Sequence, residues 1–234
     1  MRSALAFLTV VGRSQPPGPS TLDWFPAVGA GLGAALGGIW WLAGRAWPAG
    51  VAAAVVVAAD LGLTGLLHLD GLVDAADGLL PPMERSRRLT VMSAPDAGAF
   101  GVGAAGVVLL LRWSALAATR PTVWLLAGLW CLSRTVMALV VRTGRYARPE
   151  GGLASLFAGP TRWPVLVLGL AAAAGMCAAW RVTAGLAAAA TAALFAGLTV
   201  ALAQRRLGGY TGDVLGATAM VAETAGLVMA AARW

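Results

Sequence analysis

The stretch 182–203, VTAGLAAAATAALFAGLTVALA, carries no charge from end to end. An α-helix needs about 20 mainly apolar residues to cross the hydrocarbon core of a bilayer. Over the whole 234-residue chain, 59% of the residues are hydrophobic and 12% are charged, which is more apolar surface than a soluble core of this size hides. The sequence therefore predicts an all-α, polytopic transmembrane helix bundle of about seven spans, built as one integral membrane domain over 1–234. The predicted spans are 25–43, 50–69, 98–118, 121–141, 164–180, 182–203 and 214–232.

Small residues dominate these apolar runs. Alanine and glycine let transmembrane helices approach one another closely. We therefore expect tight packing within the bundle, and the same surfaces would permit a homo-oligomer.

The positive charge of the chain is arginine alone, since the sequence contains no lysine, and the net charge is +7. With seven spans, the N-terminus and the loops after spans two, four and six share one side, and most of the arginines lie there. The positive-inside rule predicts that this side is cytoplasmic. Part of the charge is then a topology signal that also contacts anionic lipid, and part is available for phosphate recognition. We expect the lipid bilayer as a partner and no nucleic acid.

The sequence from His68 to Gly78, HLDGLVDAADG, places Asp70, Asp74 and Asp77 at steps of four and three residues. On an α-helix, these steps put the three carboxylates on one face, where they repel one another. A divalent metal ion would neutralise them, so Asp70, Asp74 and Asp77 are the predicted metal ligands. The alternative is a solvated acidic helix end. His68 should point away from this face and is expected to be a structural, hydrogen-bonding residue.

Two further polar motifs are expected on the same side of the membrane. Arg142, Arg145 and Arg148 recur at every third residue, and if the segment is helical they form one basic stripe suited to a diphosphate. The alternative is positive-inside charge alone. In the second motif, Gly208–Asp213, Asp213 precedes the last span, where it is either the N-cap of that helix or a further metal ligand or base.

Arg134 lies inside the predicted span 121–141. An arginine within a membrane is costly, so it should be paired with a carboxylate such as Asp60, with one of the three aspartates, or with a substrate phosphate. Glu223 lies inside the last span and needs a proton or a partner for the same reason.

Taken together, three motifs resemble the successive signatures of the cobalamin synthase family, the adenosylcobinamide-GDP ribazoletransferases. They are HLDGLVDAADG at 68–78, RYARPEG at 145–151 and GGYTGDVLG at 208–216, and their order extends the resemblance over nearly the whole chain. The chain departs from the family pattern at 93–98, SAPDAG, where the family more often has Asp-Ser-Arg before the glycine. No role is carried onto Asp96 for this reason.

The resemblance implies a late step of vitamin B12 biosynthesis in a bacterial inner membrane, with the active site facing the cytoplasm. Adenosylcobinamide-GDP is joined to α-ribazole or α-ribazole 5′-phosphate, and GMP is released. Mg²⁺ at the aspartate face is the implied cofactor, and Asp74 or Asp77 would accept the proton of the ribose hydroxyl. The residues expected to bind substrate are Arg134, Arg142, Arg145, Arg148, Glu150, Gly212 and Asp213.

Two other functions remain open from the residues. A CDP-alcohol phosphatidyltransferase also places aspartates at helical spacing, but its usual Asp-Gly, Ala-Arg and second Asp pair are not met here. A cation or proton-coupled transporter would line a path with Asp60, Asp70, Asp74 and Arg134. Against a transporter, the acidic residues gather at one membrane face.

Overall fold

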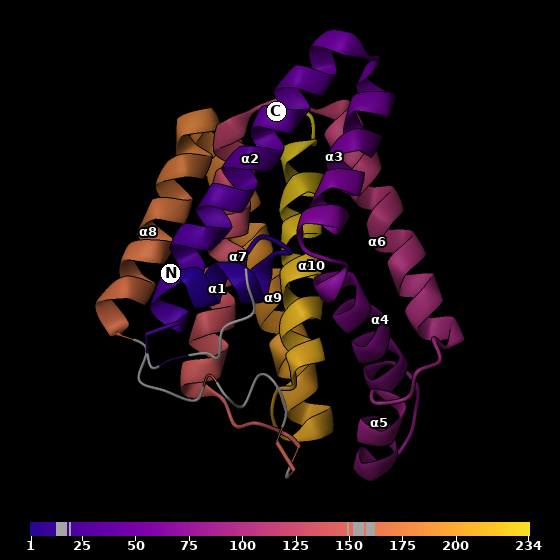
Figure 1. The fold of residues 1–234 in the computed structure, drawn as a ribbon. Helices are drawn as coiled ribbons and strands as arrows, with labels where there is room; N and C mark the ends of the chain where they lie inside the picture. The colour runs from indigo at the N-terminus through magenta and orange to yellow at the C-terminus, as the bar shows by residue number, and fades with distance from the viewer. Residues whose placement is uncertain (13–17, 19, 149, 152–156, 158–161) are drawn as a thin grey trace.

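The computed structural model describes residues 1–12, 18, 20–148, 150–151, 157 and 162–234. Every regular element in these residues is helical, which confirms the predicted all-α class (Figure 1). The helices are α1 (Arg2–Leu8), a 3₁₀ turn η1 (Leu22–Trp24), α2 (Phe25–Ala46), α3 (Ala49–Leu63), α4 (Leu67–Leu79), α5 (Arg85–Val91), α6 (Ala99–Ala118), α7 (Val123–Thr143), α8 (Trp163–Trp180), α9 (Val182–Leu207) and α10 (Gly212–Ala230).

Among the described residues, six helical segments are long and apolar enough to cross a membrane: η1 with α2, and α6, α7, α8, α9 and α10. A seventh crossing would be shared by α3 and α4, which meet at a bend of 88°. The chain is therefore a multi-pass membrane protein, as predicted.

The second predicted span, 50–69, was wrong as one continuous helix. The helix ends at Leu63, and the aspartate motif lies on the separate helix α4. Gly65 and Leu66 both adopt left-handed backbone angles, with φ of 58° and 60°. An α-helix of L-residues cannot continue through that conformation, so the chain turns sharply between the two helices.

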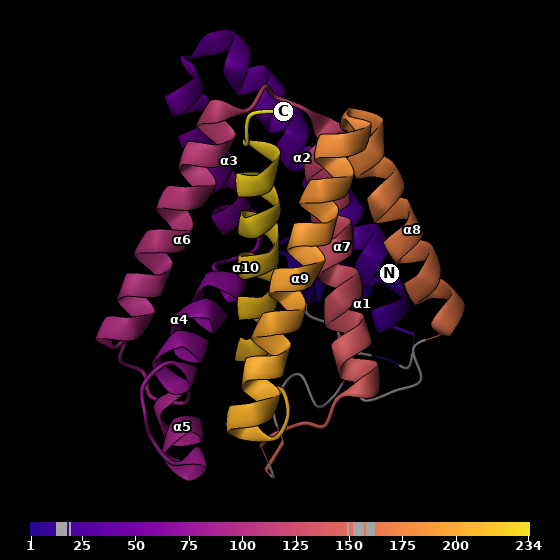
Figure 2. The same cartoon turned by 180° about the vertical axis from the view of Figure 1, so that it is seen from behind.

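Helix α10 stands near the middle of the bundle, and Figures 1 and 2 show it flanked by neighbours on both sides. It packs against α9, α4, α7 and α6. The predicted close packing of small residues is clearest between α2 and α7, where Gly29, Gly33 and Gly37 meet the backbone of α7 so closely that a methyl group on any of them would overlap it.

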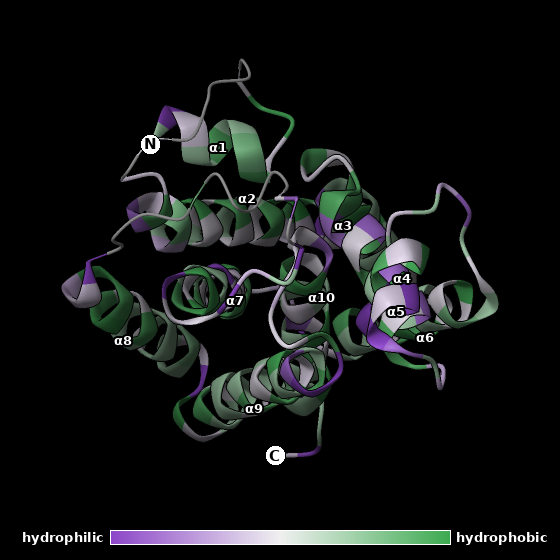
Figure 3. Ribbon diagram, turned by 90° about the horizontal axis from the view of Figure 1, so that it is seen from below, coloured by the Kyte–Doolittle hydropathy of each residue, from purple (hydrophilic) through white to green (hydrophobic). Residues whose placement is uncertain are grey.

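One end of the bundle collects the polar motifs. The end of α4, helix α5, the segment that follows α7 and the turn between α9 and α10 all lie at the lower end in Figure 1, while the C-terminus lies at the upper end. Figure 3, seen from below, shows hydrophilic residues on these same segments. The predicted convergence of the three motifs at one end is therefore confirmed.

Inside the bundle, four charges form a closed cluster. Arg112 of α6 bonds Asp60 of α3 and lies 2.8 Å from Glu223 of α10, and Arg134 of α7 bonds the other oxygen of Glu223. All four side chains are buried. The carboxylate that bonds Arg134 is therefore Glu223, and not Asp60 or one of the three aspartates as expected. The two negative charges of the cluster balance the two positive ones.

Candidate functional site

Helices α4 and α10 cross in contact at a glycine pair. A methyl group at Gly71 would lie 2.9 Å from the carbonyl oxygen of Asp213, and one at Gly216 would lie 3.2 Å from the Cα of His68. Side chains larger than hydrogen would push the two helices apart. The crossing therefore brings the beginning of the aspartate motif beside the beginning of α10.

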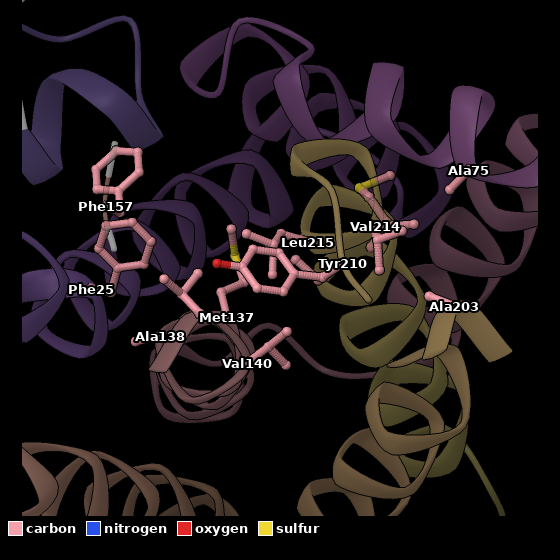
Figure 4. Packing of buried hydrophobic residues seen from close by; sticks show 14 of the residues in the cluster. Phe25, Ala75, Met137, Ala138, Val140, Phe157, Ala203, Tyr210, Val214 and Leu215 are labelled. Carbon is pink, nitrogen blue, oxygen red and sulfur yellow. The ribbon is translucent and has the colours of Figure 1, made fainter. Parts of the chain in front are cut away.

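The segment after α7 is fastened to the turn before α10 by backbone hydrogen bonds. The amide of Ala147 donates to the carbonyl of Tyr210 at 2.8 Å, and the amide of Tyr210 donates to the carbonyl of Arg145 at 2.9 Å. Gly209 permits this pairing, because a methyl group there would overlap the carbonyl oxygen of Arg145. In Figure 4, Tyr210 lies between Met137 on α7 and Leu215 on α10. Two of the predicted motifs are thus joined into one unit.

Arg148 links this unit to α10. Its Nη2 donates to Oδ2 of Asp213 at 2.8 Å and to the carbonyl of Met92 at 3.2 Å. The N-cap of α10 is Thr211, whose Oγ1 accepts from the amide of Val214 at 3.3 Å, so the N-cap alternative for Asp213 was wrong. Asp213 lies instead in the first turn, with its carboxylate turned to Arg148 and the site.

The predicted helical stripe of arginines does not form, because α7 ends at Thr143 and the following residues are not helical. Arg142 lies over the ring of Trp163, 4.6 Å from its centroid. Arg145 and Glu150 are exposed, and Pro149 lies outside the described residues. Arg148 pairs with a carboxylate of the site, that of Asp213.

The three aspartates of α4 differ in surroundings. Asp70 is exposed, Asp74 is half-buried and Asp77 is buried. Oδ2 of Asp77 accepts from the amide of Gly98 at 2.7 Å, and Oδ1 accepts from the amide of Gly101 at 2.9 Å. These amides belong to the first turn of α6, whose N-terminus favours a negative charge. Asp77 therefore anchors the start of α6.

Asp74 stands in an excess of negative charge. Its carboxylate is repelled by Asp213, Asp70 and Asp77 and attracted by Arg148. Within the described residues, no three His, Cys, Asp or Glu side chains already converge closely enough to hold a metal ion. Magnesium binding by Asp70, Asp74 and Asp77 thus stays a prediction.

A pocket of about 280 Å³ opens between α4, α7 and α10. His68 lines it together with Asp70, which differs from the expectation that the two residues point apart. Burial raises the pKa of the half-buried Tyr146 hydroxyl, so the phenol stays protonated at neutral pH. The lining residues that matter below are Phe7, His68, Asp70, Tyr146, Arg148 and Asp213.

Two arginines that the sequence did not mark as structural, Arg88 and Arg206, hold the end of α4. Nη1 of Arg88 donates to the carbonyls of Gly78 at 2.6 Å and Pro81 at 2.9 Å, and Nη1 of Arg206 donates to the carbonyl of Leu80 at 3.2 Å. Guanidinium groups here satisfy carbonyls that lack helical partners and meet the negative end of the helix. The signal in the sequence is the Pro81-Pro82 pair followed by Arg85, Arg87 and Arg88, for which the sequence predicts a topology signal and phosphate recognition but no structural role.

The model of the cobalamin-5-phosphate synthase family matches residues 1–231. Curated relatives named adenosylcobinamide-GDP ribazoletransferase include one from Chlorobaculum tepidum, 35% identical over 97% of this chain and 91% of its own length. The relative from Ectopseudomonas mendocina is 38% identical over 97% of this chain and 96% of its own length. The relative from Deinococcus radiodurans is 36% identical over 94% of this chain and 81% of its own length. No solved structure matches the chain.

Proposed function

This chain belongs to the cobalamin-5-phosphate synthase family, and we propose that it is an adenosylcobinamide-GDP ribazoletransferase. The observation that carries the proposal is the family match over residues 1–231, which includes each of the motifs that meet at the lower end of the bundle. The reaction joins adenosylcobinamide-GDP to α-ribazole or α-ribazole 5′-phosphate and releases GMP.

In this reaction, a ribose hydroxyl oxygen forms a bond to the phosphorus that carries the cobinamide. The bond from that phosphorus to the oxygen of GMP breaks, and the hydroxyl proton passes to a base. We assign the base to Asp74, because its partial burial and, after that, the neighbouring carboxylates that repel it favour uptake of a proton. Asp77 is a weaker candidate, since both of its oxygens already accept amide hydrogens at the start of α6.

A divalent cation fits this site by charge. Asp70 and Asp213 both repel the carboxylate of Asp74, and Arg148 is the cation that pairs with Asp213 at 2.8 Å. Carboxylate oxygens are the ligands that Mg²⁺ prefers. We propose that Asp70 and Asp74, with Asp213, would hold Mg²⁺, which when bound supplies charge compensation for the diphosphate. Asp77 would support these ligands by holding α6 in place.

The arginines supply the remaining charge for the substrate. We propose that Arg142 and Arg145 contact the diphosphate; Arg145 is exposed in the segment after α7. Arg148 would hold Asp213 in place at the edge of the pocket. Glu150, exposed two residues beyond Arg148, and Gly212, on the pocket wall, are the further proposed contacts.

The proposed location is the bacterial inner membrane, with the polar end in the cytoplasm, because nucleotide-activated substrates are made there and most arginines lie at that end. The transporter alternative is not favoured. Asp60 and Arg134, which would line its path, are held in the buried cluster with Arg112 and Glu223.

The proposal is tested by incubating purified protein in detergent with adenosylcobinamide-GDP, α-ribazole and Mg²⁺. Adenosylcobalamin, identified by mass, should appear together with GMP in equal amount. A matched reaction without α-ribazole controls for hydrolysis of the GDP group. Release of GMP at the same rate in both reactions would contradict ribazole transfer.

A further inference from the structure

His68 is the starting point, because it is a buried polar side chain without a partner. Only 3% of its surface is exposed. Within the described part of the chain, neither Nδ1 nor Nε2 has a hydrogen-bond partner. Buried polar groups are normally satisfied, so an imidazole left open is expected to meet something that the protein alone does not provide.

The partner must come from the pocket. The charged groups that act on His68 from within the bundle are Arg134 and Arg112, which can only donate hydrogen bonds. Glu223, whose carboxylate could accept one, is already bonded by both guanidinium groups. His68 is also one of the residues that line the 280 Å³ pocket, so a ligand bound there would lie against it.

The size and the walls of the pocket select the ligand. Small-molecule sites enclose roughly 300–1,000 Å³, so this pocket of about 280 Å³ lies just below that range. It suits a flat base, whereas a corrinoid ring is several times too large. Phe7, Met137 and Leu215 give it apolar walls, and Tyr146 adds an aromatic ring. Aromatic rings stack on the faces of bases.

The number of open hydrogen-bonding groups in the pocket distinguishes guanine from the base of the acceptor nucleoside. A guanine carries several donors and acceptors, each of which needs a partner when buried. Arg148 and Asp213 are bonded to each other, and Asp70 is exposed. Among the described lining residues, the buried nitrogens without a partner are then the two of His68 and Nε of Arg148, which are too few for a guanine. A benzimidazole nucleoside offers one free ring nitrogen, an acceptor, on an otherwise apolar base.

We propose that this pocket binds the base of the acceptor nucleoside and that His68 donates a hydrogen bond to its free ring nitrogen. The proposal rests on the proposed function for the identity of the acceptor. Tyr146 lies beside the base, and the ribose extends toward Asp70 and Asp74. His68 thus gives specificity for a base with one ring nitrogen.

The test measures equilibrium binding of two nucleosides to the detergent-solubilised full chain. One carries benzimidazole and the other carries indole, which replaces the ring nitrogen with a carbon. The wild type should bind the benzimidazole nucleoside about tenfold more tightly, as the loss of one hydrogen bond implies. His68→Leu should bind both nucleosides equally, and His68→Gln, which keeps a donor, should recover part of the preference.

Other outcomes overturn the proposal. If His68→Leu keeps the tenfold preference, the ring nitrogen is read elsewhere, and if it weakens GMP binding while nucleoside binding is unchanged, the pocket holds guanine. Equal binding of both nucleosides by the wild type also refutes it. Release of GMP by the wild type in the transfer reaction shows separately whether the proposed function holds. A His68→Gln variant that elutes as the wild type does on size exclusion controls for folding.

Discussion

Arg148 and Asp213, 65 residues apart in the chain, lie 2.8 Å apart at the edge of the pocket. The contact joins the segment after α7 to the first turn of α10, and through it two of the three motifs share one electrostatic environment. About a fifth of each side chain is exposed, so solvent screens the ion pair and its contribution to the free energy of unfolding should be small. Its importance should lie in placing charge at the site.

The first prediction concerns this pair. Arg148→Ala and Asp213→Ala should each lower kcat/KM for transfer by at least about tenfold, while the double variant should lose less than the product of the two losses, since residues in contact are coupled. The measurement is a double-mutant cycle on initial rates of GMP release. Independent losses that multiply would show that the two residues act separately.

The second prediction separates Asp74 from Asp77. Asp74→Asn should reduce kcat by roughly a hundredfold or more, because it removes both a carboxylate charge and the proposed base, and should leave thermal unfolding in detergent unchanged. Asp77→Asn should lower Tm by several degrees. The asparagine side chain has one acceptor oxygen in place of two, so it cannot accept from the backbone N–H groups of both Gly98 and Gly101 in the same way. An Asp77→Asn variant that is inactive yet as stable as the wild type would place Asp77 in the chemistry.

Helical periodicity was enough to place Asp70, Asp74 and Asp77 on one helix, but it could not distinguish their surroundings. The partners of Asp77 are the amides of Gly98 and Gly101, more than twenty residues away, and no local pattern marks a carboxylate that starts another helix. The break at Gly65 was missed for a similar reason, since one glycine within an apolar run is tolerated in a helix.

The buried charges were visible in the sequence as interruptions of apolar spans, and the need for pairing followed from the cost of burial. The choice of Glu223 as the partner of Arg134 did not follow, because it depends on α7 and α10 lying side by side. The bond from Trp130 Nε1 to Asp60 at 3.1 Å was equally hidden. Pair identities come from the arrangement of the helices, which periodicity does not provide.

The third prediction concerns this cluster. Glu223→Met should lower Tm by roughly 6 °C or more, because it leaves Arg134 and Arg112 with Asp60 as their one remaining carboxylate partner in the cluster. Adding Arg134→Met restores a neutral pair and should recover part of the loss. Val228→Ala, on the exposed face of the same helix, is the control.

Activity in the double variant addresses the substrate contact predicted for Arg134. If the folded fraction retains near wild-type turnover, Arg134 serves the core and does not touch the substrate. A thousandfold loss of turnover in a double variant whose Tm is restored would indicate that Arg134 contacts the substrate.

The last prediction concerns orientation, on which the assembly of the site in the cytoplasm depends. Single cysteines are placed at Ser86 on α5 and Gln204 near the end of α9, both exposed at the polar end, and at Ala118, exposed at the opposite end of α6. The background replaces the buried Cys131 and Cys177 with alanine. In intact spheroplasts, a membrane-impermeant maleimide should label the cysteine at Ala118. The cysteines at Ser86 and Gln204 should be labelled only after lysis, because arginine-rich segments remain on the cytoplasmic side. If the cysteine at Gln204 is labelled in spheroplasts while the one at Ser86 is protected, the motifs lie on opposite sides of the bilayer and the shared site is contradicted. If both are labelled while the one at Ala118 is protected, the protein has the opposite orientation in the membrane.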